Sequence, residues 1–369
     1  MGHSYFKNYR NKTVLITGHT GFKGSWLTLW LHHLGAKVVG YALPPPPQPN
    51  LFEILSLEKK CTHVPGNILD RDCLAAVVDQ YRPNSIFHLA AQPFVRLSYR
   101  NPVETYAVNV MGTVNVLDVA RYARGVQTIV AVTSDKCYEN REWVYGYRES
   151  DPMGGYDPYS SSKGCAELAI AAFRRSYFMP RRSRRASVPP VVVSARAGNI
   201  IGGGDWGMDR IIPDAMRAFS ARKTLVIRNP LAIRPWQYVL EPLGGYLLLG
   251  SGCLTDRKIA EAGAWNFGPA ANDAITVRQL VALVQKSWGG GSVKTDTSPQ
   301  VHEANYLKLD ISKARSQLGW QPRYSVDEAV RRSIGWYKQY YGGAAAVDII
   351  RRSLNEIEHY MAVCQPEKK

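Results

Sequence analysis

The first half of this chain alternates short, continuous apolar runs with longer segments whose apolar residues follow helical spacing. The apolar runs cover residues 13–17, 37–42, 61–67, 85–92, 128–135 and 191–198. The helical segments cover residues 24–35, 71–83, 102–124 and 157–178. Continuous apolar character is typical of strands buried on both faces, and regular alternation with helices favours parallel pairing. The pattern therefore predicts an α/β fold built on a Rossmann-type, doubly wound parallel sheet.

The pattern loosens after Gly198, where glycine and proline become frequent. Short apolar runs at 224–228 and 264–268 mix there with helical stretches, which predicts a smaller, mixed α/β substrate-binding lobe. We expect three parts: an NAD-binding domain at 10–198, to which segments around 229–268 return, a mainly substrate-binding lobe at 199–345, and a C-terminal helix and tail at 346–369.

The formal net charge is +16, which raises the question of an acidic partner. The densest basic run, 174–190, contains six arginines and is typical of a helix end that continues into a surface loop. No aromatic platform accompanies these arginines, so we expect no nucleic-acid binding.

Three classes of protein are disfavoured by what the sequence lacks. Its six cysteines form no CxxC pair and no HExxH motif occurs, so we expect neither a disulfide framework nor a metal site. No apolar run reaches membrane-spanning length, and the N-terminal residues lack the core of a signal peptide. We therefore expect a cytoplasmic protein with no membrane partner.

A glycine-rich turn, TGHTGFKGSW, follows the first apolar run and opens the first helical segment. Gly18, Gly21 and Gly24 leave room for the backbone to approach a pyrophosphate, and the helix N-terminus offers free N–H groups. The turn predicts a dinucleotide site that includes His19, Phe22 and Lys23.

The nature of the dinucleotide follows from the second apolar run. An acid is expected near its end to bind the adenosine ribose, but positions 40–42 read Gly-Tyr-Ala. No arginine stands there to bind a 2′-phosphate either. We expect NAD as the cofactor, with the ribose contact unassigned.

A YxxxK pair, Tyr159 and Lys163, begins the last helical segment. Residues four apart share one helix face, and an ammonium beside a phenol favours the phenolate, which can act as a base. Ser134, in TSDKCY at the end of the preceding apolar run, can hydrogen-bond the same substrate oxygen. Together the three residues predict an alcohol-oxidising site.

These motifs resemble a known family. The set TGHTGFKG, HLAAQ, NVMGT, TSDKCY, YSSSK and RAGNIIGGGDW is similar to the extended short-chain dehydrogenase/reductase family, and within it to the nucleotide-sugar 4,6-dehydratases. TSDKCYENREW and IRPWQYVLEPLGGY resemble the cytidine-linked members, from about residue 10 to about residue 340. The resemblance implies an NAD-dependent hydro-lyase that converts CDP-D-glucose to a 4-keto-6-deoxy sugar for surface polysaccharide.

Elimination of water from a hexose needs an acid and a base, and Asp135 and Lys136 are adjacent in TSDKCY. The resemblance implies that Asp135 protonates the departing 6-hydroxyl. Deoxythymidine-linked relatives have glutamate where Lys136 stands. A lysine acts as a base only in its neutral form, so two roles are open: Lys136 removes the C5 proton, or its charged form stabilises the enolate.

The resemblance also implies further contacts. The expected cofactor contacts, beside the glycine turn, Tyr159 and Lys163, are Asn67, Ile68, Leu89, Ala90 and Ala91. The expected substrate contacts are Gln92, Arg96, Asn199, Gly203, Arg234, Tyr306 and Lys308.

Three alternatives are open: another nucleotide-sugar 4,6-dehydratase, a 4-epimerase of the same family, and a non-catalytic dinucleotide-binding regulatory protein. An epimerase of the same family needs Tyr159 and Lys163 but no adjacent acid and base, so Asp135 with Lys136 disfavours it. A non-catalytic dinucleotide-binding regulator would be expected to lose the tyrosine–lysine pair, which is present. The helices at 101–124 and 157–179 suit a four-helix interface in this family, which implies a homodimer or homotetramer.

Overall fold

The structure is a computed structural model that describes residues 6–179, 189–255, 259, 261, 263–270, 273–298 and 306–364. Most of the arginine-rich loop after residue 179, and the first part of the HEANYLKLD segment, lie outside these ranges. Within them, no helix is both long and apolar enough to cross a membrane.

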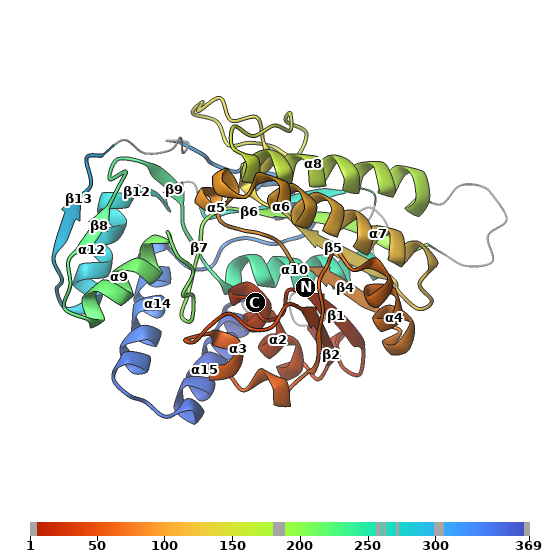
Figure 1. Ribbon diagram of the computed structural model, residues 1–369, viewed down its shortest axis with the longest axis horizontal. Coiled ribbons are helices and arrows are strands. Elements are labelled where there is room, and N and C mark those ends of the chain that lie inside the picture. The colour runs from red at the N-terminus through yellow and green to blue at the C-terminus, as the bar shows by residue number, and fades with distance from the viewer. Residues whose placement is uncertain are drawn as a thin grey trace, which may run out of the picture.

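Seven strands form one sheet, in which every neighbouring pair is parallel (Figure 1). The strands are β1 (Thr13–Thr17), β2 (Lys37–Ala42), β3 (Thr62–Pro65), β4 (Ser85–His88), β5 (Thr128–Val132), β6 (Val191–Ala197) and β11 (Ala264–Phe267). Their order is β11-β6-β5-β4-β1-β2-β3. The direction of winding reverses between β1 and β4, so the predicted doubly wound fold is confirmed.

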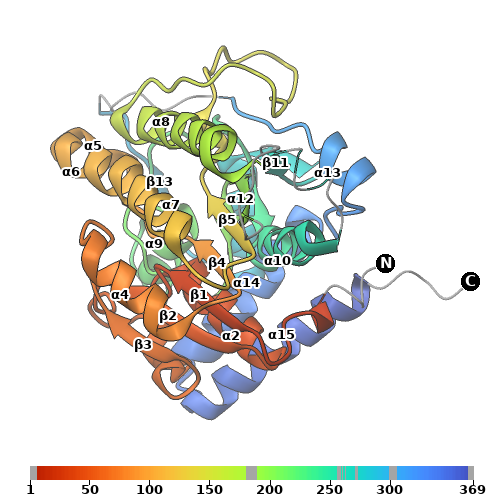
Figure 2. The same ribbon diagram turned by 90° about the vertical axis from the view of Figure 1, so that its right-hand side faces the viewer.

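Both faces of this sheet are covered by helices (Figure 2). Val14 and Ile16 of β1 belong to one hydrophobic core, whereas Leu15 between them belongs to the other. One core includes α2 (Phe22–His33), α10 (Leu240–Thr255) and α15 (Ala346–Val363); the other includes α4 (Arg71–Tyr81), α7 (Gly112–Tyr122) and α8 (Pro158–Phe173). Alternate side chains of a strand point to opposite faces, which explains why the strands are apolar throughout.

Several predicted element boundaries are wrong; for example, the strand predicted at 128–135 ends at Val132. The strand predicted at 85–92 ends at His88, and the helix predicted at 102–124 is divided by a π-helical segment, η2 (Ala107–Met111). One side chain accounts for both, because the Asn109 amide accepts from the backbone N–H of Gln92 and donates to its carbonyl. These bonds hold residue 92 away from the sheet, and Asn109 lies in the π-helical segment itself. Such single π-helical turns are frequent at functional sites.

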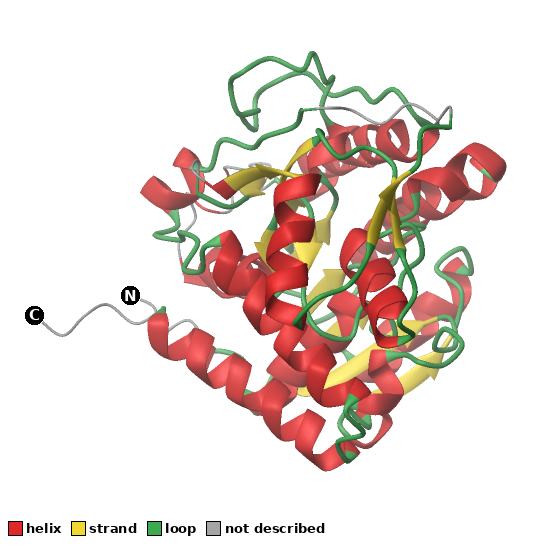
Figure 3. Cartoon of the chain, turned by 90° about the vertical axis from the view of Figure 1, so that its left-hand side faces the viewer, coloured by secondary structure: helices red, strands yellow, loops and turns green. Residues whose placement is uncertain are grey.

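A smaller lobe lies beside the sheet and contains three two-stranded sheets (Figure 3). They pair β7 (Ile200–Ile201) with β10 (Gln237–Tyr238), β9 (Ile233–Pro235) with β12 (Ala274–Thr276), and β8 (Leu225–Ile227) with β13 (Val293–Thr295). Its helices are α9 (Ile211–Ser220), α12 (Val277–Trp288) and α14 (Val326–Tyr341), whereas α13 (Ser312–Gln317) packs against β11 of the main sheet. The remaining short elements are α3 (Leu51–Ile54), η1 (Leu57–Lys59), α5 (Val95–Arg100), α6 (Pro102–Tyr106), η3 (Asp135–Cys137) and η4 (Arg174–Phe178). Although α10 and β11 follow residue 198, they pack on or join the main sheet.

A buried carboxyl group joins the C-terminal segments to the sheet. Glu241, at the start of α10, is fully buried. It accepts hydrogen bonds from the backbone N–H groups of Arg323 and Tyr324, both at 2.8 Å, and from the Tyr360 hydroxyl at 2.9 Å. Burial raises the pKa of Glu241 to about 7 despite these donors, because desolvation penalises the charged form.

This shift predicts that Glu241 makes stability depend on pH. In the unfolded chain the carboxyl ionises near pH 4.5, whereas in the folded protein it keeps its proton to about pH 7. Between these values the folded state binds more protons, so the unfolding free energy falls as pH rises. The unfolding free energy of the wild type minus that of Glu241→Gln should fall by roughly 3 kcal/mol from pH 4 to pH 8, at about 1.4 kcal/mol per pKa unit. Urea denaturation across this range measures it, and a constant difference would contradict it.

Candidate active site

The predicted phosphate turn lies between the C-terminal ends of β1 and β4. Gly18 has φ +77°, and a Cβ there would lie 2.7 Å from the backbone nitrogen of Ala90. A Cβ on Gly24 would lie 2.1 Å from the carbonyl oxygen of Gly18. Helix α2 begins after Gly21 with no side-chain cap and no acid in its first turn. The turn is therefore closely packed and leaves backbone donors for an anion, as a dinucleotide site requires.

His19 of this turn does not face the cavity described below. Its imidazole lies against Gly40, where a Cβ would be 2.2 Å from the ring, and its Nε2 is 2.7 Å from Nδ1 of His63. Burial, and then His63, lower the pKa of His19 to about 3, so the ring is neutral. The imidazole thus fills the space at the end of β2 where a ribose-binding acid was expected.

The other predicted cofactor residues line the same edge of the sheet. Ala90 packs against Gly18, and the backbone N–H of Leu89 donates to the Thr17 carbonyl. Ile68 is buried against Gly112. Ala91 directly follows Ala90. Asn67, which precedes Ile68, accepts a hydrogen bond from the backbone N–H of Leu69. Their contact with a cofactor stays a prediction.

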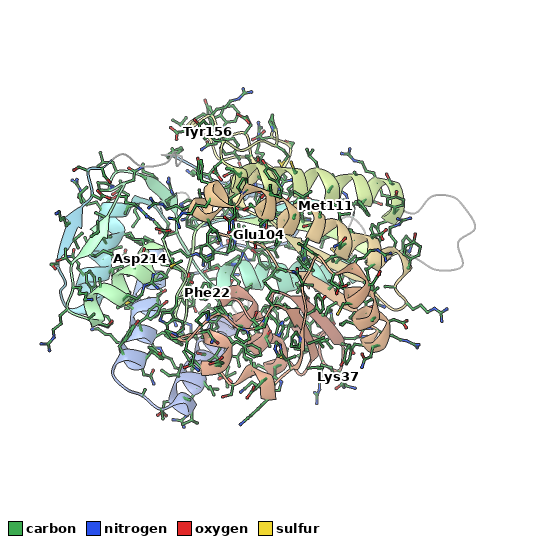
Figure 4. The ribbon with its side chains drawn as sticks, viewed as in Figure 1. Phe22, Lys37, Glu104, Met111, Tyr156 and Asp214 are labelled. Atoms are coloured by element: carbon green, nitrogen blue, oxygen red, sulfur yellow. The ribbon has the colours of Figure 1, made fainter. Side chains whose placement is uncertain are left out.

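A cavity of about 570 Å³ opens between this edge and the smaller lobe. The predicted site residues that line it are Phe22, Lys23, Arg96, Ser134, Asp135, Lys136, Tyr159, Asn199 and Arg234. In Figure 4, Phe22 lies near the centre of the molecule and Asp214, which lines the cavity from the lobe, lies to its left. Residues from nearly every part of the chain converge here.

Four predicted substrate residues are not among the described residues that line this cavity. The Gln92 amide is used internally, because it donates to Thr105 and accepts from the backbone of Phe94. Gly203 packs against Trp336, where a Cβ would lie 2.1 Å from the indole, and its carbonyl accepts from Trp26. Both residues make contacts within the protein, and their contact with a substrate stays a prediction.

Tyr306 and Lys308 lie in the segment beside β9. Residue 306 forms a β-bridge with Ile233, and the Lys308 carbonyl accepts from the backbone N–H of Tyr147. Their backbone therefore supports the strand that carries Arg234, and direct substrate contact by either side chain stays a prediction.

Tyr159 and Lys163 lie in the first turns of α8, which Asp157 caps by accepting from the backbone of Ser160. Burial raises the pKa of Tyr159 to about 12, and the hydrogen bond with Ser134 opposes this. Burial lowers the pKa of Lys163 to about 8. Tyr159 and Ser134 therefore lie within hydrogen-bonding reach of each other, and their shared contact with one substrate oxygen stays a prediction.

Asp135 is almost completely buried beside Tyr159. Its Oδ1 accepts from the Ser134 hydroxyl at 3.0 Å, while its buried Oδ2 has no hydrogen-bond partner among the described residues. Burial raises the pKa of this carboxyl, although Lys136 and Ser134 oppose the shift. A buried acid that lines the cavity, whose pKa is raised and whose second oxygen has no hydrogen-bond partner among the described residues, suits proton donation. Lys136 also lines the cavity and is only partly buried.

Sequence reasoning missed Arg210, which also lines the cavity. Its guanidinium donates to Asp205 at 2.8 Å and lies 5.2 Å from the centre of the Phe94 ring. Its charge lowers the pKa of Tyr159, and it acts with burial and Lys163 to lower the pKa of Lys23 to about 7. The signal was the sequence GGGDWGMDR, where two acids and an arginine interrupt a glycine-rich segment.

The sequence also contained no indication of a charged cluster that lines the same cavity. Asp209 pairs with Arg96 of α5 at 3.6 Å and with Arg228, which follows β8. The three residues connect the main sheet's helices with the lobe across the cavity. No signal in the sequence pairs these positions, because they are brought together only by folding.

Comparison with known proteins places the chain. The family profile described as GDP-mannose 4,6 dehydratase matches residues 15–333. The chain belongs to this family. The recognised resemblance to nucleotide-sugar 4,6-dehydratases is thereby confirmed.

Within this dehydratase family, the CDP-glucose 4,6-dehydratase of Salmonella typhimurium is 49% identical over 359 residues, which cover 96% of this chain and 98% of that protein. The solved dTDP-glucose 4,6-dehydratase of Bacillus anthracis, in complex with NAD, has a TM-score of 0.73 at 20% identity and covers 89% of this chain and 97% of its own. The UDP-glucose 4-epimerase of Thermotoga maritima, with UDP-glucose, has a TM-score of 0.75 at 21% identity and covers 89% and 99%. At these identities the two structures establish the fold alone.

Proposed function

We propose that the chain is an NAD-dependent CDP-D-glucose 4,6-dehydratase, which forms CDP-4-dehydro-6-deoxy-D-glucose. The observation that carries this proposal is the buried carboxyl of Asp135, whose pKa is raised by burial, in the same cavity as the Tyr159–Ser134 pair. The likeness to the Salmonella enzyme supports cytidine as the base.

The residues present fit NAD. The closely packed Gly18–Gly24 turn and the uncapped N-terminus of α2 suit its pyrophosphate, and Ala90 lies beside them. NAD, when bound, accepts the hydride from C4 of the sugar and returns it to C6. Among the described residues, no group of three or more His, Cys, Asp or Glu could hold a metal ion.

The first half of the reaction rests on Tyr159. As the phenolate it removes the proton of the sugar 4-hydroxyl, while Ser134 hydrogen-bonds the same oxygen. The charge of Arg210 favours the phenolate directly, and Lys163 lies one helical turn from Tyr159 on the same face of α8. Since burial alone holds the phenol neutral, these neighbours are needed for the base to form at moderate pH.

The second half rests on Asp135 and Lys136. The 4-ketone acidifies the C5 proton, which passes to a base, while Asp135 gives its proton to the 6-hydroxyl, which leaves as water. Lys136 lines the cavity next to Asp135 and is placed to take the C5 proton or to stabilise the enolate. Return of hydride to C6 and of a proton to C5 completes the product.

A 4-epimerase is the second candidate, because solved epimerases share the fold. Epimerisation returns hydride to the carbon that lost it and needs no leaving-group acid. One buried oxygen of Asp135 has no hydrogen-bond partner among the described residues. An unpaired buried carboxyl oxygen is costly and is retained where it serves chemistry, which favours dehydration.

The same proposal extends to assembly and setting. Exposed apolar side chains line α6, η2 and α8, including Val103, Met111 and Leu168, which are 82%, 51% and 61% exposed. These helices lie side by side, with Met111 labelled on them in Figure 4. They suit a self-complementary homodimer face, and a homotetramer would need a second one. We place the enzyme in the cytoplasm, supplying deoxysugars for O-antigen and other lipopolysaccharide synthesis.

The test is incubation with CDP-, UDP-, GDP- and dTDP-glucose, followed by the alkali-sensitive absorbance of a 4-keto product. CDP-glucose should be the preferred substrate, and the product should have lost the 6-hydroxyl by mass. Formation of CDP-galactose without loss of water would establish the epimerase instead.

We expect Tyr159→Phe to abolish turnover while NAD binding, followed by protein fluorescence, stays nearly unchanged. The phenol is the base of the first step, whereas the glycine turn supplies the pyrophosphate contacts. Replacement of the exposed Tyr156 by Phe is the matched control and should keep full activity. Substantial turnover by Tyr159→Phe would remove the tyrosine from its role.

Asp135→Asn should slow elimination more than oxidation. An amide cannot give a proton to the departing hydroxyl, but removal of the C4 hydrogen does not need that proton. In a single turnover, absorbance of the reduced cofactor should therefore accumulate transiently. Equal slowing of both steps, with no such absorbance, would contradict the assignment.

Lys136→Met should reduce turnover roughly 10²–10⁴-fold if the lysine is the C5 base, the usual scale for a positioned general base. Lys136→Glu should then retain part of the activity, because a carboxylate can take the same proton. A base lysine gives activity that rises with pH, and a cationic one gives activity that falls as it loses its proton. Exchange of the C5 hydrogen with deuterated solvent reports the step; native exchange by Lys136→Met would show that another group is the base.

A further inference from the structure

A buried carboxylate lies directly behind the Thr133–Tyr138 turn, which carries Ser134, Asp135 and Lys136 and is called the catalytic turn below. Glu167 of α8 is only 4% exposed. Its Oε1 accepts from the Thr133 hydroxyl, and its Oε2 accepts from the Ser194 hydroxyl at 2.8 Å and from the Arg196 guanidinium at 2.7 Å. Ser194 and Arg196 lie in β6, and Thr133 directly follows β5, so one side chain joins α8 to two neighbouring strands of the sheet.

The position of Glu167 links both halves of the oxidising site. It lies four residues after Lys163, so the two side chains share one face of α8. Thr133, its hydrogen-bond donor, directly precedes Ser134, and the Thr133 backbone is fixed by donation to the Ala195 carbonyl at 2.9 Å. The carboxylate therefore touches the turn that carries Ser134 and Asp135 and stands one helical turn from the lysine.

Arg196 completes a rigid frame around this carboxylate. Its other terminal nitrogen donates to the Tyr138 hydroxyl at 2.7 Å and to the Glu149 carbonyl at 3.1 Å. Tyr138 in turn donates to Asn266 of β11 at 2.7 Å. Both ends of the Thr133–Tyr138 turn are thus held from behind by the same ion pair.

The electrostatics agree with this geometry. Burial opposes ionisation of Glu167, but Arg196 and three hydrogen bonds outweigh it and hold the pKa of the carboxyl below its usual value. Burial lowers the pKa of Lys163 to about 8, and the charge of Glu167 opposes that shift.

Other ionisable groups also face Lys163. Cys137 of η3 favours its charged form. His88 of β4 is neutral, because burial and Lys163 lower its pKa to about 3, and Lys23 of α2 carries a competing positive charge. Tyr159, on the same helix face, is the group that Lys163 serves. Glu167 is therefore the principal negative charge that favours the ammonium.

We propose that Glu167 is a positioning residue for the oxidation step: it keeps Lys163 charged beside Tyr159 and, through Thr133, fixes the turn that presents Ser134 and Asp135. The inference rests on the proposed function, in which the Tyr159 phenolate takes the proton of the 4-hydroxyl. Glu167 is not among the described residues that line the cavity, so it acts on the reaction rate and not on substrate affinity.

The pH dependence of turnover tests the electrostatic part. Loss of the carboxylate in Glu167→Gln should lower the pKa of Lys163 by at least one unit, within the about 1–3 units typical of a nearby opposite charge. Because the ammonium is the active form, the alkaline limb of kcat should move to lower pH by the same amount. At pH 8, where about half of the native Lys163 is charged, kcat should fall about fivefold or more, with KM for CDP-D-glucose within about threefold of wild type.

A matched control is Glu241→Gln, which also removes a buried carboxyl but lies outside the site. Its alkaline limb should stay in place. A Glu167→Gln enzyme whose activity falls uniformly, with an unmoved alkaline limb, would show that the ion pair is structural only and overturn the proposal.

Thr133 variants decide the case even if Glu167→Gln, which leaves Arg196 buried and unpaired, does not fold. Thr133→Val removes the hydroxyl without stranding a charge and should lower kcat about tenfold with KM little changed, whereas Thr133→Ser should restore it. Native kcat in Thr133→Val would overturn the positioning role.

An independent readout separates this inference from the proposed function. NMR titration of ¹³C-labelled lysine, with Lys163→Arg used to assign the signal, reports the charge of Lys163 without any substrate. A lower midpoint in Glu167→Gln supports the inference even if CDP-D-glucose is not the substrate. An unchanged midpoint overturns it even if CDP-D-glucose is turned over.

Discussion

The site depends on one constraint: parallel strands that are buried on both faces must all end at the same edge of the sheet. In this chain β1, β4, β5 and β6 are adjacent strands. Their ends bring the phosphate turn at Gly18, the segment after His88, the catalytic turn at Ser134 and the glycine-rich segment after Gly198 to one edge. Groups far apart in sequence therefore share a single cavity, and the smaller lobe closes it from the other side.

Burial at that edge sets the chemistry. It lowers the pKa of Lys23 to about 7 and that of Lys163 to about 8, and it raises the pKa of both Asp135 and Tyr159. A cavity that favours neutral forms suits an acid that must keep its proton but opposes a phenolate base. The structure offsets this with specific neighbours: the Ser134 hydroxyl and Arg210 for the phenol, and Glu167 for the lysine.

The fold by itself does not distinguish dehydration from epimerisation, because solved proteins of both kinds superimpose on this chain. The difference must lie in the site. Asp135 is the group with no use in epimerisation, and the structure leaves one of its oxygens unpaired and buried. Gly198, directly after β6, lies opposite this oxygen, and a Cβ at residue 198 would be 3.0 Å from it. The lack of a side chain at residue 198 therefore leaves space beside the acid.

The sequence alone predicts the sheet, the phosphate turn and the proposed catalytic residues Ser134, Asp135, Lys136, Tyr159 and Lys163. Each of these is a local pattern: an apolar run buried on two faces, a glycine spacing, or two residues one helical turn apart. Element boundaries were less secure, since the end of β4 at His88 depends on hydrogen bonds between Gln92 and the distant Asn109.

Only the tertiary structure decided which remaining residues face the cavity. Gln92 and Gly203 carry the expected residue types but are turned into packing contacts by Thr105 and Trp336. Arg210 lies at the site because its guanidinium contacts Asp205 and Phe94. Glu167 lies behind the site, where it accepts a hydrogen bond from Arg196. The physical reason is that a short-range pattern fixes backbone geometry within one turn or strand, whereas the partner of a charged or polar side chain is chosen by residues that only folding brings within hydrogen-bonding distance.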